Sequence, residues 1–398
     1  MTSKGLPFCG TMALLCPPLV IDFSPLAGCD ECLAFIFSHA QNWVGGAKVR
    51  ANRGRWERRM VTVIGAGLVA LVITMLIVAT LQKWALRVGW VYRPQPDRWQ
   101  PKSNPHPRTI ALGGGLGILA AVTLALLISL WQGNLSPLWA WTMPLALAIA
   151  LLGLLDDLRG CSAHQKLLAQ VVIALTTTLG ITRLAALPDS ISVPLTTLSL
   201  VALINAVNMM DNMDGTASGL VTLSSLGFAA LGILTDNPPV TTVSLILAAS
   251  SFGFWLFNKP PASIFMGDVG SLFLGYLLGV VAVTASQGRY PHAFAAIFVP
   301  ALMVGCFVAD ITFVTLWRLT HRLPLMKGDR NHLSHRLAVR FGGSEWRANL
   351  VLYGLQLAFC GAALLAAIAP PLGTLTIVGV ALLVLATLFL CLWQVVPN

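Results

Sequence analysis

Four short polar segments interrupt an otherwise apolar chain, and each contains side chains that can bind a cation or a phosphate group. The first segment contains the adjacent carboxylates Asp156 and Asp157, directly after an apolar run. Adjacent carboxylates repel each other unless a cation or a basic group offsets their charge. The pair therefore predicts a site for a cation or for an anionic substrate. Lys166 lies in the same segment and is a candidate phosphate contact.

The second segment, residues 205–215, has the sequence NAVNMMDNMDG. Its Asn208, Asp211 and Asp214 follow one another at intervals of three, so one helical face would carry all of them. Mg²⁺ prefers such hard oxygen ligands and usually binds one or two carboxylates together with phosphate oxygens and water. The alternating ligands and terminal Glu of an EF-hand are missing. The segment therefore predicts a magnesium-assisted phosphate site.

Asp268 belongs to the third segment, residues 258–271, with the sequence NKPPASIFMGDVGS. Gly267 and Gly270 let the backbone approach a ligand closely, and free N–H groups at the start of the next predicted helix favour an anion. We therefore predict Asp268 as a metal ligand. Phe265 is a candidate platform for a flat base, although a Phe near the end of a span is more often a packing residue.

The fourth segment, residues 327–337, has the sequence KGDRNHLSHRL. The spacing and the Glu of a zinc-binding HExxH motif are absent. His332 and His335 lie between Arg330 and Arg336, which indicates an anion-binding patch because Arg binds phosphate in a bidentate manner. The alternative is a basic loop that binds anionic lipid headgroups. Asp310, within an apolar run, is expensive to bury and is expected to pair with a basic residue or with the polar site.

The elements that hold these segments are predicted to be transmembrane helices. The chain has 398 residues, of which 56% are hydrophobic and 10% charged, whereas soluble domains carry about 25% charged residues. Its apolar runs are long enough to cross ~30 Å of hydrocarbon as helices and lack the alternation of barrel strands. We expect an all-α, polytopic integral membrane protein with about eleven transmembrane helices. The predicted spans are 61–82, 110–131, 137–155, 167–187, 191–207, 217–234, 240–257, 269–287, 293–317, 348–369 and 372–396.

The distribution of Lys and Arg predicts the orientation of these spans. Sixteen of them lie in one set of loops, and the alternate loops after Met60 contain only Arg183 and Arg289. Basic loops stay in the cytoplasm, so the four polar segments and the active site are expected on the cytoplasmic side. The net charge of +10 is then explained without a nucleic-acid partner. The basic loops are 83–109, 156–166, 208–216, 258–268 and 318–347.

Residues 1–59 differ from the transmembrane domain expected over residues 60–398. They contain a lone pair, Cys29 and Cys32, which is a weak metal or redox signal. They also contain a basic run before Met60, which the orientation above would place outside. We favour the interpretation that this extension does not belong to the working protein. The alternative is an exception to the charge rule.

Taken in order, GLLDD at 153–157, NAVNMMDNMDG at 205–215, FMGDVGS at 265–271 and HLSH at 332–335 resemble one family closely. It is the polyprenyl-phosphate N-acetylhexosamine-1-phosphate transferases of glycosyltransferase family 4. The resemblance runs from about Val61 to the last span. It implies transfer of a sugar-1-phosphate from a UDP-amino sugar to undecaprenyl or another polyprenyl phosphate, with release of UMP, at the bacterial inner membrane. The implied role is the first membrane step of a cell-envelope glycan pathway.

The resemblance also implies a role for each matching residue, with Mg²⁺, or Mn²⁺ in its place, as the cofactor. Asn258 and Phe265 match positions that contact the uracil ring. Ser334 stands where the family has a denser histidine run, which removes that middle position from catalysis. The lipid phosphate is largely dianionic at neutral pH because its second pKa is ~6, so either Asp156 or Asp157 is a base or a phosphate-positioning group. The full assignment is catalytic Asp156, Asp157, Asp268, His332 and His335; substrate-binding Lys166, Asn208, Asp211, Asp214, Asn258, Phe265 and Arg330; and metal-binding Asp268, Asp156 and Asp211.

UDP-N-acetylglucosamine is the expected donor, because the loop 318–347 resembles the simple-sugar branch of the family. Two alternatives remain open: a phospho-N-acetylmuramoyl-pentapeptide transferase of the same family, and a membrane transporter that uses Asp310. The acidic residues gather at one face and no internal repeat is apparent, which disfavours a transporter. A monomer and a homodimer are both compatible with the sequence.

Overall fold

The computed structural model describes residues 49–92, 109–324 and 330–395, with side chains described from Met60 onward except at 137–138. The chain divides into two compact units, Met1–Glu57 and Arg58–Asn398. Most of the expected extension, residues 1–59, lies outside the described residues. The second unit is described below.

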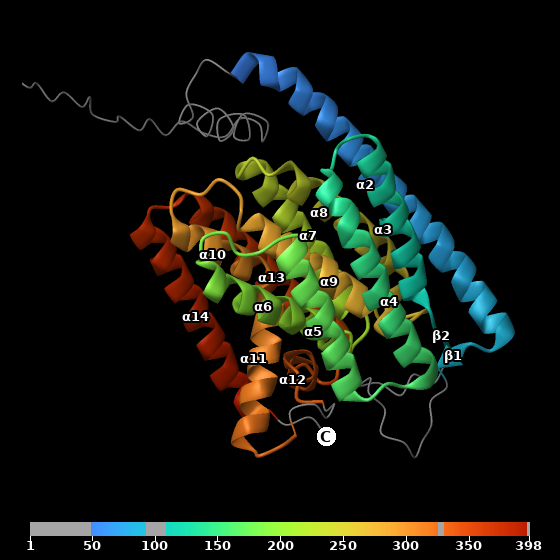
Figure 1. Ribbon diagram of the computed structural model, residues 1–398. Helices are drawn as coiled ribbons and strands as arrows, with labels where there is room; N and C mark the ends of the chain where they lie inside the picture. The colour runs from blue at the N-terminus through green and yellow to red at the C-terminus, as the bar shows by residue number, and fades with distance from the viewer. Residues whose placement is uncertain (1–48, 93–108, 325–329, 396–398) are drawn as a thin grey trace, which may run out of the picture. The chain divides into compact units, whose positions relative to one another are not determined.

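The described part of the chain is almost entirely helical (Figure 1), as the sequence predicts. A small antiparallel sheet pairs β1 (Val91–Tyr92) with β2 (Ile110–Ala111). The 3-10 helix η1 is Pro137–Trp141. The α-helices are α2 (Val49–Val88), α3 (Gly114–Trp131), α4 (Thr142–Arg159), α5 (Ala163–Gly180), α6 (Asp189–Met210), α7 (Thr216–Leu234), α8 (Pro238–Asn258), α9 (Gly267–Ala285), α10 (Ala293–Met303), α11 (Gly305–Thr320), α12 (Leu333–Arg340), α13 (Glu345–Ile368) and α14 (Pro371–Trp393).

Nine helices in the described ranges are long and apolar enough to cross a membrane, and the pair α10 and α11 qualifies as one broken span. These helices confirm a multi-pass membrane protein and match ten of the predicted spans. The span predicted over 293–317 is not one continuous helix, because α10 and α11 meet at an angle of 77°. Pro300, near the end of α10, provides no backbone N–H and interrupts the helical hydrogen bonding there.

Helix α5 overlaps the remaining predicted span, 167–187, but is not among the nine helices that are apolar enough to cross a membrane. Its crossing therefore stays a prediction. Three side-chain contacts connect α5 and the residues just after it to α9, and we call this series the polar ladder. It consists of Lys166 with Asp268, Thr177 with Tyr276, and Thr182 with Thr284.

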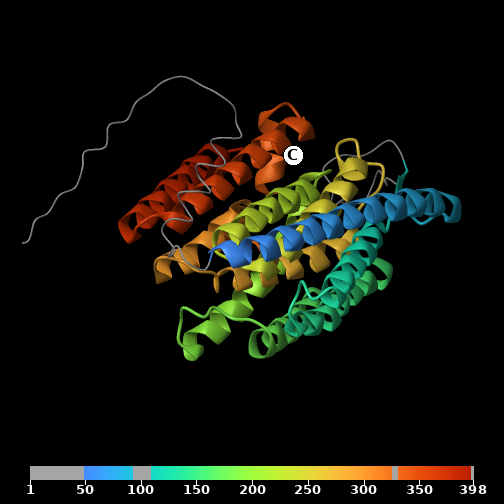
Figure 2. The ribbon, with the colours of Figure 1, turned by 90° about the horizontal axis from the view of Figure 1, so that it is seen from above.

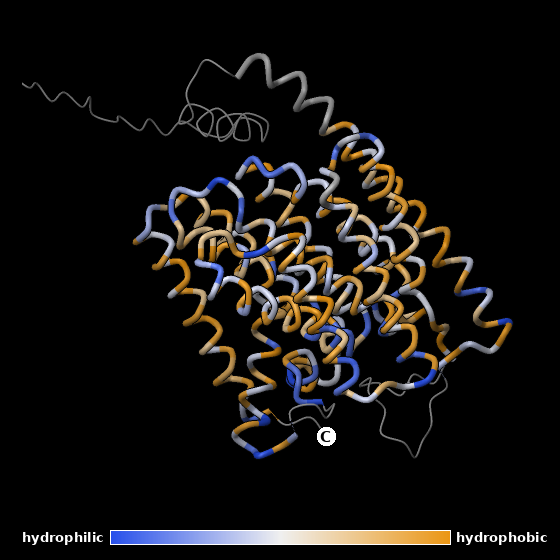
Figure 3. The backbone as a smooth tube through the Cα atoms, viewed as in Figure 1, coloured by the Kyte–Doolittle hydropathy of each residue, from blue (hydrophilic) through white to orange (hydrophobic). Residues whose placement is uncertain are grey.

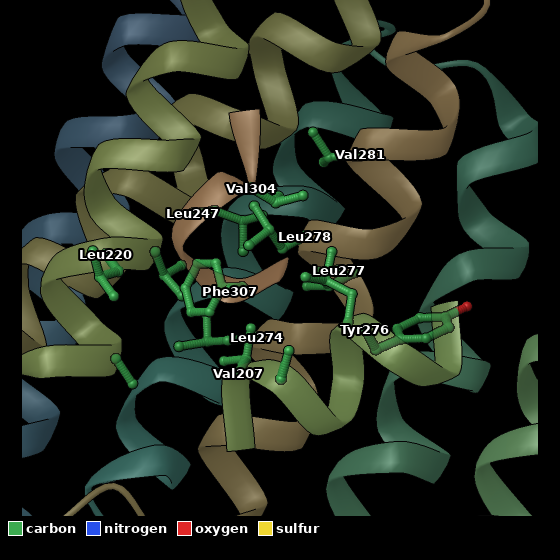
Figure 4. Close-up of a cluster of buried hydrophobic side chains, with 14 of the residues drawn as sticks. Val207, Leu220, Leu247, Leu274, Tyr276, Leu277, Leu278, Val281, Val304 and Phe307 are labelled. Atoms are coloured by element: carbon green, nitrogen blue, oxygen red, sulfur yellow. The ribbon is translucent and has the colours of Figure 1, made fainter. Parts of the chain in front are cut away.

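Helix α9 occupies the centre of the second unit. In the most apolar window of α9, 83% of the residues are buried, compared with 11% for α14, so α9 faces protein whereas α14 exposes its side chains to lipid. Helices α3 and α4 lie on one side of α9, and α13 and α14 lie on the other (Figures 1 and 2). Leu274, Leu277 and Leu278 of α9 pack with Phe307 and Val304 in this core (Figure 4).

Hydrophilic residues gather at one end of the bundle, around α12 and the connection between α4 and α5 (Figure 3). Two glycines allow other helices to approach the start of α9 at this end. A Cβ atom on Gly115 of α3 would meet the backbone of Gly270, and one on Gly153 of α4 would meet the carbonyl of Asp268. Both residues therefore have to be small for α3 and α4 to reach the start of α9.

Candidate active site

Three helices bring Asp156, Lys166 and Asp268 into one cluster at this end of the bundle. The Lys166 ammonium group lies 2.7 Å from Asp156 Oδ2 and also pairs with Asp268 Oδ2. A capping box formed by Ser162 and Gln165 starts α5 and so places Lys166 in the first helical turn. The backbone N–H of Cys161 donates to Asp156 Oδ1 at 2.5 Å. Lys166 therefore lies between two of the acidic residues, and its predicted phosphate contact stays a prediction.

Asp157 binds the start of α9 rather than the lysine. Its Oδ1 accepts the N–H of Asp268 at 2.9 Å, and its Oδ2 accepts the N–H of Val269 at 3.1 Å. These are free donors of the first helical turn, and a carboxylate there is stabilised by the helix dipole. A Cβ atom on Gly267 would lie 2.6 Å from Asp157 Oδ2, and the positive φ of 74° at that glycine aims the turn toward the carboxylate. Asp157 therefore positions Asp268.

Asn208, in the last turn of α6, completes the arrangement. Its amide nitrogen donates to Asp268 Oδ1 at 2.9 Å and to Ser271 Oγ at 2.9 Å. Asp268 is therefore held through both carboxylate oxygens and through its backbone. Asp211 caps the C-terminal end of α6 and is partly buried.

The carboxylates of the described cluster outnumber its ammonium group. Asp156 and Asp268 share Lys166, and Asp157 lies beside them on the N–H groups of α9. Among the described residues, no three His, Cys, Asp or Glu side chains converge in a preformed metal cage. Mg²⁺ does not need one, since it usually binds one or two carboxylates and takes its other ligands from substrate phosphates and water. Asp156 and Asp268, both held on one side by Lys166, fit that donor set.

The loop between α8 and α9 is fixed by buried polar groups. Asn258, 1% exposed, accepts the N–H of Gly215 at 3.1 Å and donates to the carbonyl of Ile264 at 3.0 Å. Asp214, 2% exposed, accepts the N–H of Ala262 at 2.8 Å. These contacts give Asn258 and Asp214 positioning roles, because their side chains connect the loop to the start of α7, and their predicted substrate contacts stay predictions.

Phe265 is 3% exposed and packs against Ile110 and Ala262. The ring of Tyr92 meets it edge to face, with the ring centroids 5.6 Å apart. These contacts favour the packing alternative, and the predicted role as a platform for uracil stays a prediction. Two N–H groups at the start of α3 donate to the carbonyls of Phe265 and Met266, so this residue anchors the loop to its neighbour helix.

The histidine segment forms the short helix α12, and its two histidines are buried. His332 Nδ1 lies 2.7 Å from Asp310 Oδ2, which identifies the partner expected for that carboxylate. The rings of His332 and His335 meet edge to face with centroids 6.1 Å apart. Ser334 donates to Asn212 Oδ1 at 2.8 Å, so the residue that departs from the family pattern connects α12 to the segment 205–215.

Arg336 does not form the predicted anion patch. It is fully buried, donates to the carbonyls of Leu392 and Trp393 at 2.8 and 3.0 Å, and stacks on Trp317 with 3.9 Å between the guanidinium carbon and the ring centroid. It attaches α12 to the end of α14. Arg330 is partly buried at the start of the segment, and its predicted phosphate contact stays a prediction.

Two positioning residues are absent from the sequence assignment. Asn349 of α13 is fully buried, donates to the Asp214 carbonyl at 2.7 Å and accepts from Thr216 at 2.6 Å. Ser271 shares the Asn208 amide with Asp268. Asn349 could have been recognised as a polar residue within an apolar span. Ser271 could have been recognised because it belongs to the FMGDVGS motif.

Comparison with known proteins agrees with this geometry. Residues 139–286 match the family model described as glycosyl transferase family 4. A probable undecaprenyl-phosphate N-acetylglucosaminyl 1-phosphate transferase of Bacillus subtilis (strain 168) is 30% identical over 312 residues, which are 75% of this chain and 83% of the relative. A decaprenyl-phosphate N-acetylglucosaminephosphotransferase of Mycolicibacterium smegmatis is 30% identical over 321 residues, 72% of this chain and 78% of the relative.

A phospho-N-acetylmuramoyl-pentapeptide-transferase of Lactiplantibacillus plantarum is 28% identical over 295 residues, 69% of this chain and 88% of the relative. The region that matches the family model, residues 139–286, contains Asp156, Lys166, Asn208 and Asp268, the residues that the structure brings together. The identity and the coverage of the Bacillus relative extend well beyond those motifs. The chain belongs to glycosyl transferase family 4.

Proposed function

We propose that this protein transfers N-acetylglucosamine-1-phosphate from UDP-N-acetylglucosamine to a polyprenyl phosphate and releases UMP. The reaction takes place at the cytoplasmic face of the bacterial plasma membrane. The observation that carries the proposal is the cluster of Asp156, Lys166 and Asp268 at one end of an apolar bundle. The names of the Bacillus and Mycolicibacterium relatives, which specify an N-acetylglucosamine phosphate and a polyprenyl phosphate acceptor, support it.

The chemistry requires two anions to meet. An oxygen of the lipid phosphate attacks the phosphorus next to the sugar, a new P–O–P bond forms, and the bond to the phosphate of UMP breaks. The lipid phosphate is largely dianionic because its second pKa is ~6, so the attack needs no strong base. Lys166 lowers the repulsion between the two phosphates and stabilises the charge that develops on UMP.

Asp156, Asp268 and Asp211 are the residues that would hold Mg²⁺ in this proposal. The bound ion supplies positive charge for the diphosphate of the donor. Asp157 is occupied by two backbone N–H groups of α9, which favours Asp156 over Asp157 as the carboxylate that faces the ligand. Asn208 keeps Asp268 in one orientation.

The muramoyl-pentapeptide reaction is the second candidate, and the 28% identical relative of Lactiplantibacillus plantarum favours it. Both reactions release UMP and use the same acceptor class. They differ in the group attached to the sugar, so the donor decides between them.

The test uses the purified full chain in detergent with undecaprenyl phosphate and Mg²⁺. UMP and the lipid-linked product are measured with UDP-N-acetylglucosamine and, in parallel, with UDP-N-acetylmuramoyl-pentapeptide. We expect product with the first donor only. Product with the second donor alone would support the second candidate, and uptake of a solute into sealed vesicles without UMP release would support a transporter.

Asp268→Asn tests the site within the same assay. It removes one negative charge and leaves the shape of the side chain, so we expect transfer to be abolished while the protein still inserts into the membrane. The matched control is Asp236→Asn, because Asp236 forms an exposed ion pair with Arg289 at the opposite end of the bundle. Wild-type turnover by Asp268→Asn would overturn the assignment.

A further inference from the structure

Asp310 is a carboxylate in the interior of the bundle that the proposed reaction does not use. It lies on α11, is fully buried and is surrounded by apolar residues such as Phe313 and Phe307 of the same helix. An ionised carboxylate at such a position is expensive unless it is paired and hydrogen-bonded. The Asp310 carboxylate therefore requires groups that pair with it and donate hydrogen bonds to it.

Both oxygens of Asp310 bind the start of α12. Oδ2 lies 2.7 Å from Nδ1 of His332, and Oδ1 accepts the backbone N–H of Leu333 at 2.8 Å. His332 is the N-cap residue of α12 and Leu333 is its first residue. One carboxylate thus fixes both the ring and the backbone at this point. The 77° bend between α10 and α11 sets the direction of the helix that presents the carboxylate.

The contact with Asp310 also determines the proton on the ring. A carboxylate at Nδ1 requires a proton there and fixes the orientation of the ring. Within the described ranges, the protein makes no hydrogen bond to Nε2 of His332, and this nitrogen is not among the fully buried unpartnered atoms. The ring therefore has Nε2 available for a group outside the pair.

The position of α12 connects this histidine to the active site. Ser334 bonds to Asn212 at 2.8 Å, and Asn212 belongs to the segment that supplies Asn208, the residue that holds Asp268. Of the described titratable groups, Asp310 and His335 contact His332. The groups that Nε2 would meet at such a site are the phosphate groups of the substrates.

We propose that Asp310 is a positioning residue for the transfer reaction: by binding Nδ1 it holds the His332 ring so that Nε2 contacts a phosphate group of the bound substrates. The proposal rests on the proposed function. It assigns to a carboxylate of a membrane helix the orientation of a histidine in the catalytic segment.

The test is a double-mutant cycle on the purified full chain. Asp310→Asn keeps an oxygen for the Leu333 N–H, but its NH₂ group faces Nδ1 of His332 and cannot accept the Nδ1–H. We expect kcat to fall about 10- to 100-fold, the effect of losing one charge-assisted hydrogen bond, with little change in the KM for the UDP-sugar. His332→Gln removes the ring, so adding Asp310→Asn to His332→Gln should lower kcat hardly further, since coupled residues are not additive.

A purely structural Asp310 predicts a different pattern. If the carboxylate only caps α12, Asp310→Asn lowers kcat by the same factor in the wild-type and His332→Gln backgrounds, which overturns the proposal. Wild-type kcat for Asp310→Asn overturns it as well. Thermal unfolding of each variant and Asp236→Asn as a neutral control show that the proteins are folded. A wild-type protein that releases no UMP contradicts the proposed function itself and is thereby distinguished from both outcomes.

Discussion

Lys166 pairs with both Asp156 and Asp268, and replacing it tests the electrostatics of the site. Lys166→Met keeps much of the length of the side chain and removes its charge. At the 2.7 Å between Lys166 Nζ and Asp156 Oδ2, opposite unit charges attract by about 6 kcal/mol at an effective dielectric constant of about 20. Desolvation offsets part of this gain, and removing one partner from a buried pair costs about 3–5 kcal/mol. The two side chains remain 17% and 18% exposed, so we expect the lower end of that range.

The assay is thermal unfolding in detergent, once with EDTA and once with Mg²⁺ at matched ionic strength. We expect Lys166→Met to unfold at a lower temperature in EDTA and to regain stability with Mg²⁺, because the cation offsets the charge of Asp156 and Asp268. Mg²⁺ at about ten times its Kd would restore about 1.4 kcal/mol. The gain should be smaller in the wild type, where the ammonium group competes for the same oxygens.

Lys83→Met is the matched control, since Lys83 is exposed on α2 and its replacement should change the stability by no more than about 0.5 kcal/mol. The reasoning would be refuted if Lys166→Met were as stable as the wild type in EDTA. It would equally be refuted if Mg²⁺ stabilised the wild type and Lys166→Met by the same amount.

Two further substitutions test the elements that support the site. Gly153→Ala should lower the free energy of unfolding by about 1–3 kcal/mol and lower turnover, because the new methyl group collides with the Asp268 carbonyl. The control is Gly354→Ala, which has no atom within 4 Å of the added Cβ and should leave both the unfolding temperature and UMP release unchanged. Equal effects of the two substitutions would contradict the close-packing argument. Arg336→Lys should lower stability by about 1–3 kcal/mol, since Lys lacks the planar fork that binds two carbonyls and stacks on Trp317. Limited proteolysis should then cut the end of α14 sooner, and an unchanged cleavage pattern would argue against this attachment.

The acidic cluster could be predicted from the sequence because each of its residues belongs to a short polar motif. Asp156, Asn208 and Asp268 each lie at the end or the start of an apolar run, so the ends of the helices determine their position. Their convergence at one end of the bundle follows from the alternating topology, which the distribution of Lys and Arg indicates. The fold class was predictable for the same reason, since apolar runs of this length form helices in lipid.

The orientation of individual side chains was not predictable from the motifs. Asn258 and Asp214 have the chemistry of ligand contacts, but the structure directs them to the backbone of Gly215 and Ala262. Whether a polar group binds substrate or backbone depends on partners far away in the sequence. The bend at Val304 and the burial of Arg336 depend in the same way on how α11, α12 and α14 pack.

The polar ladder between α5 and α9 has a consequence for biogenesis. Thr177 and Tyr276 are 99 residues apart, and Lys166 and Asp268 are 102 apart. A ribosome that adds about 5–20 residues per second takes about 5–20 s to deliver the second member of each pair. During that interval Lys166 and Thr177 lack their partners on α9, so α5 must be retained by α4 and α6 or remain at the membrane surface. The insertion of α5 is therefore expected to be completed late, when α9 emerges, so that this step of folding waits for synthesis.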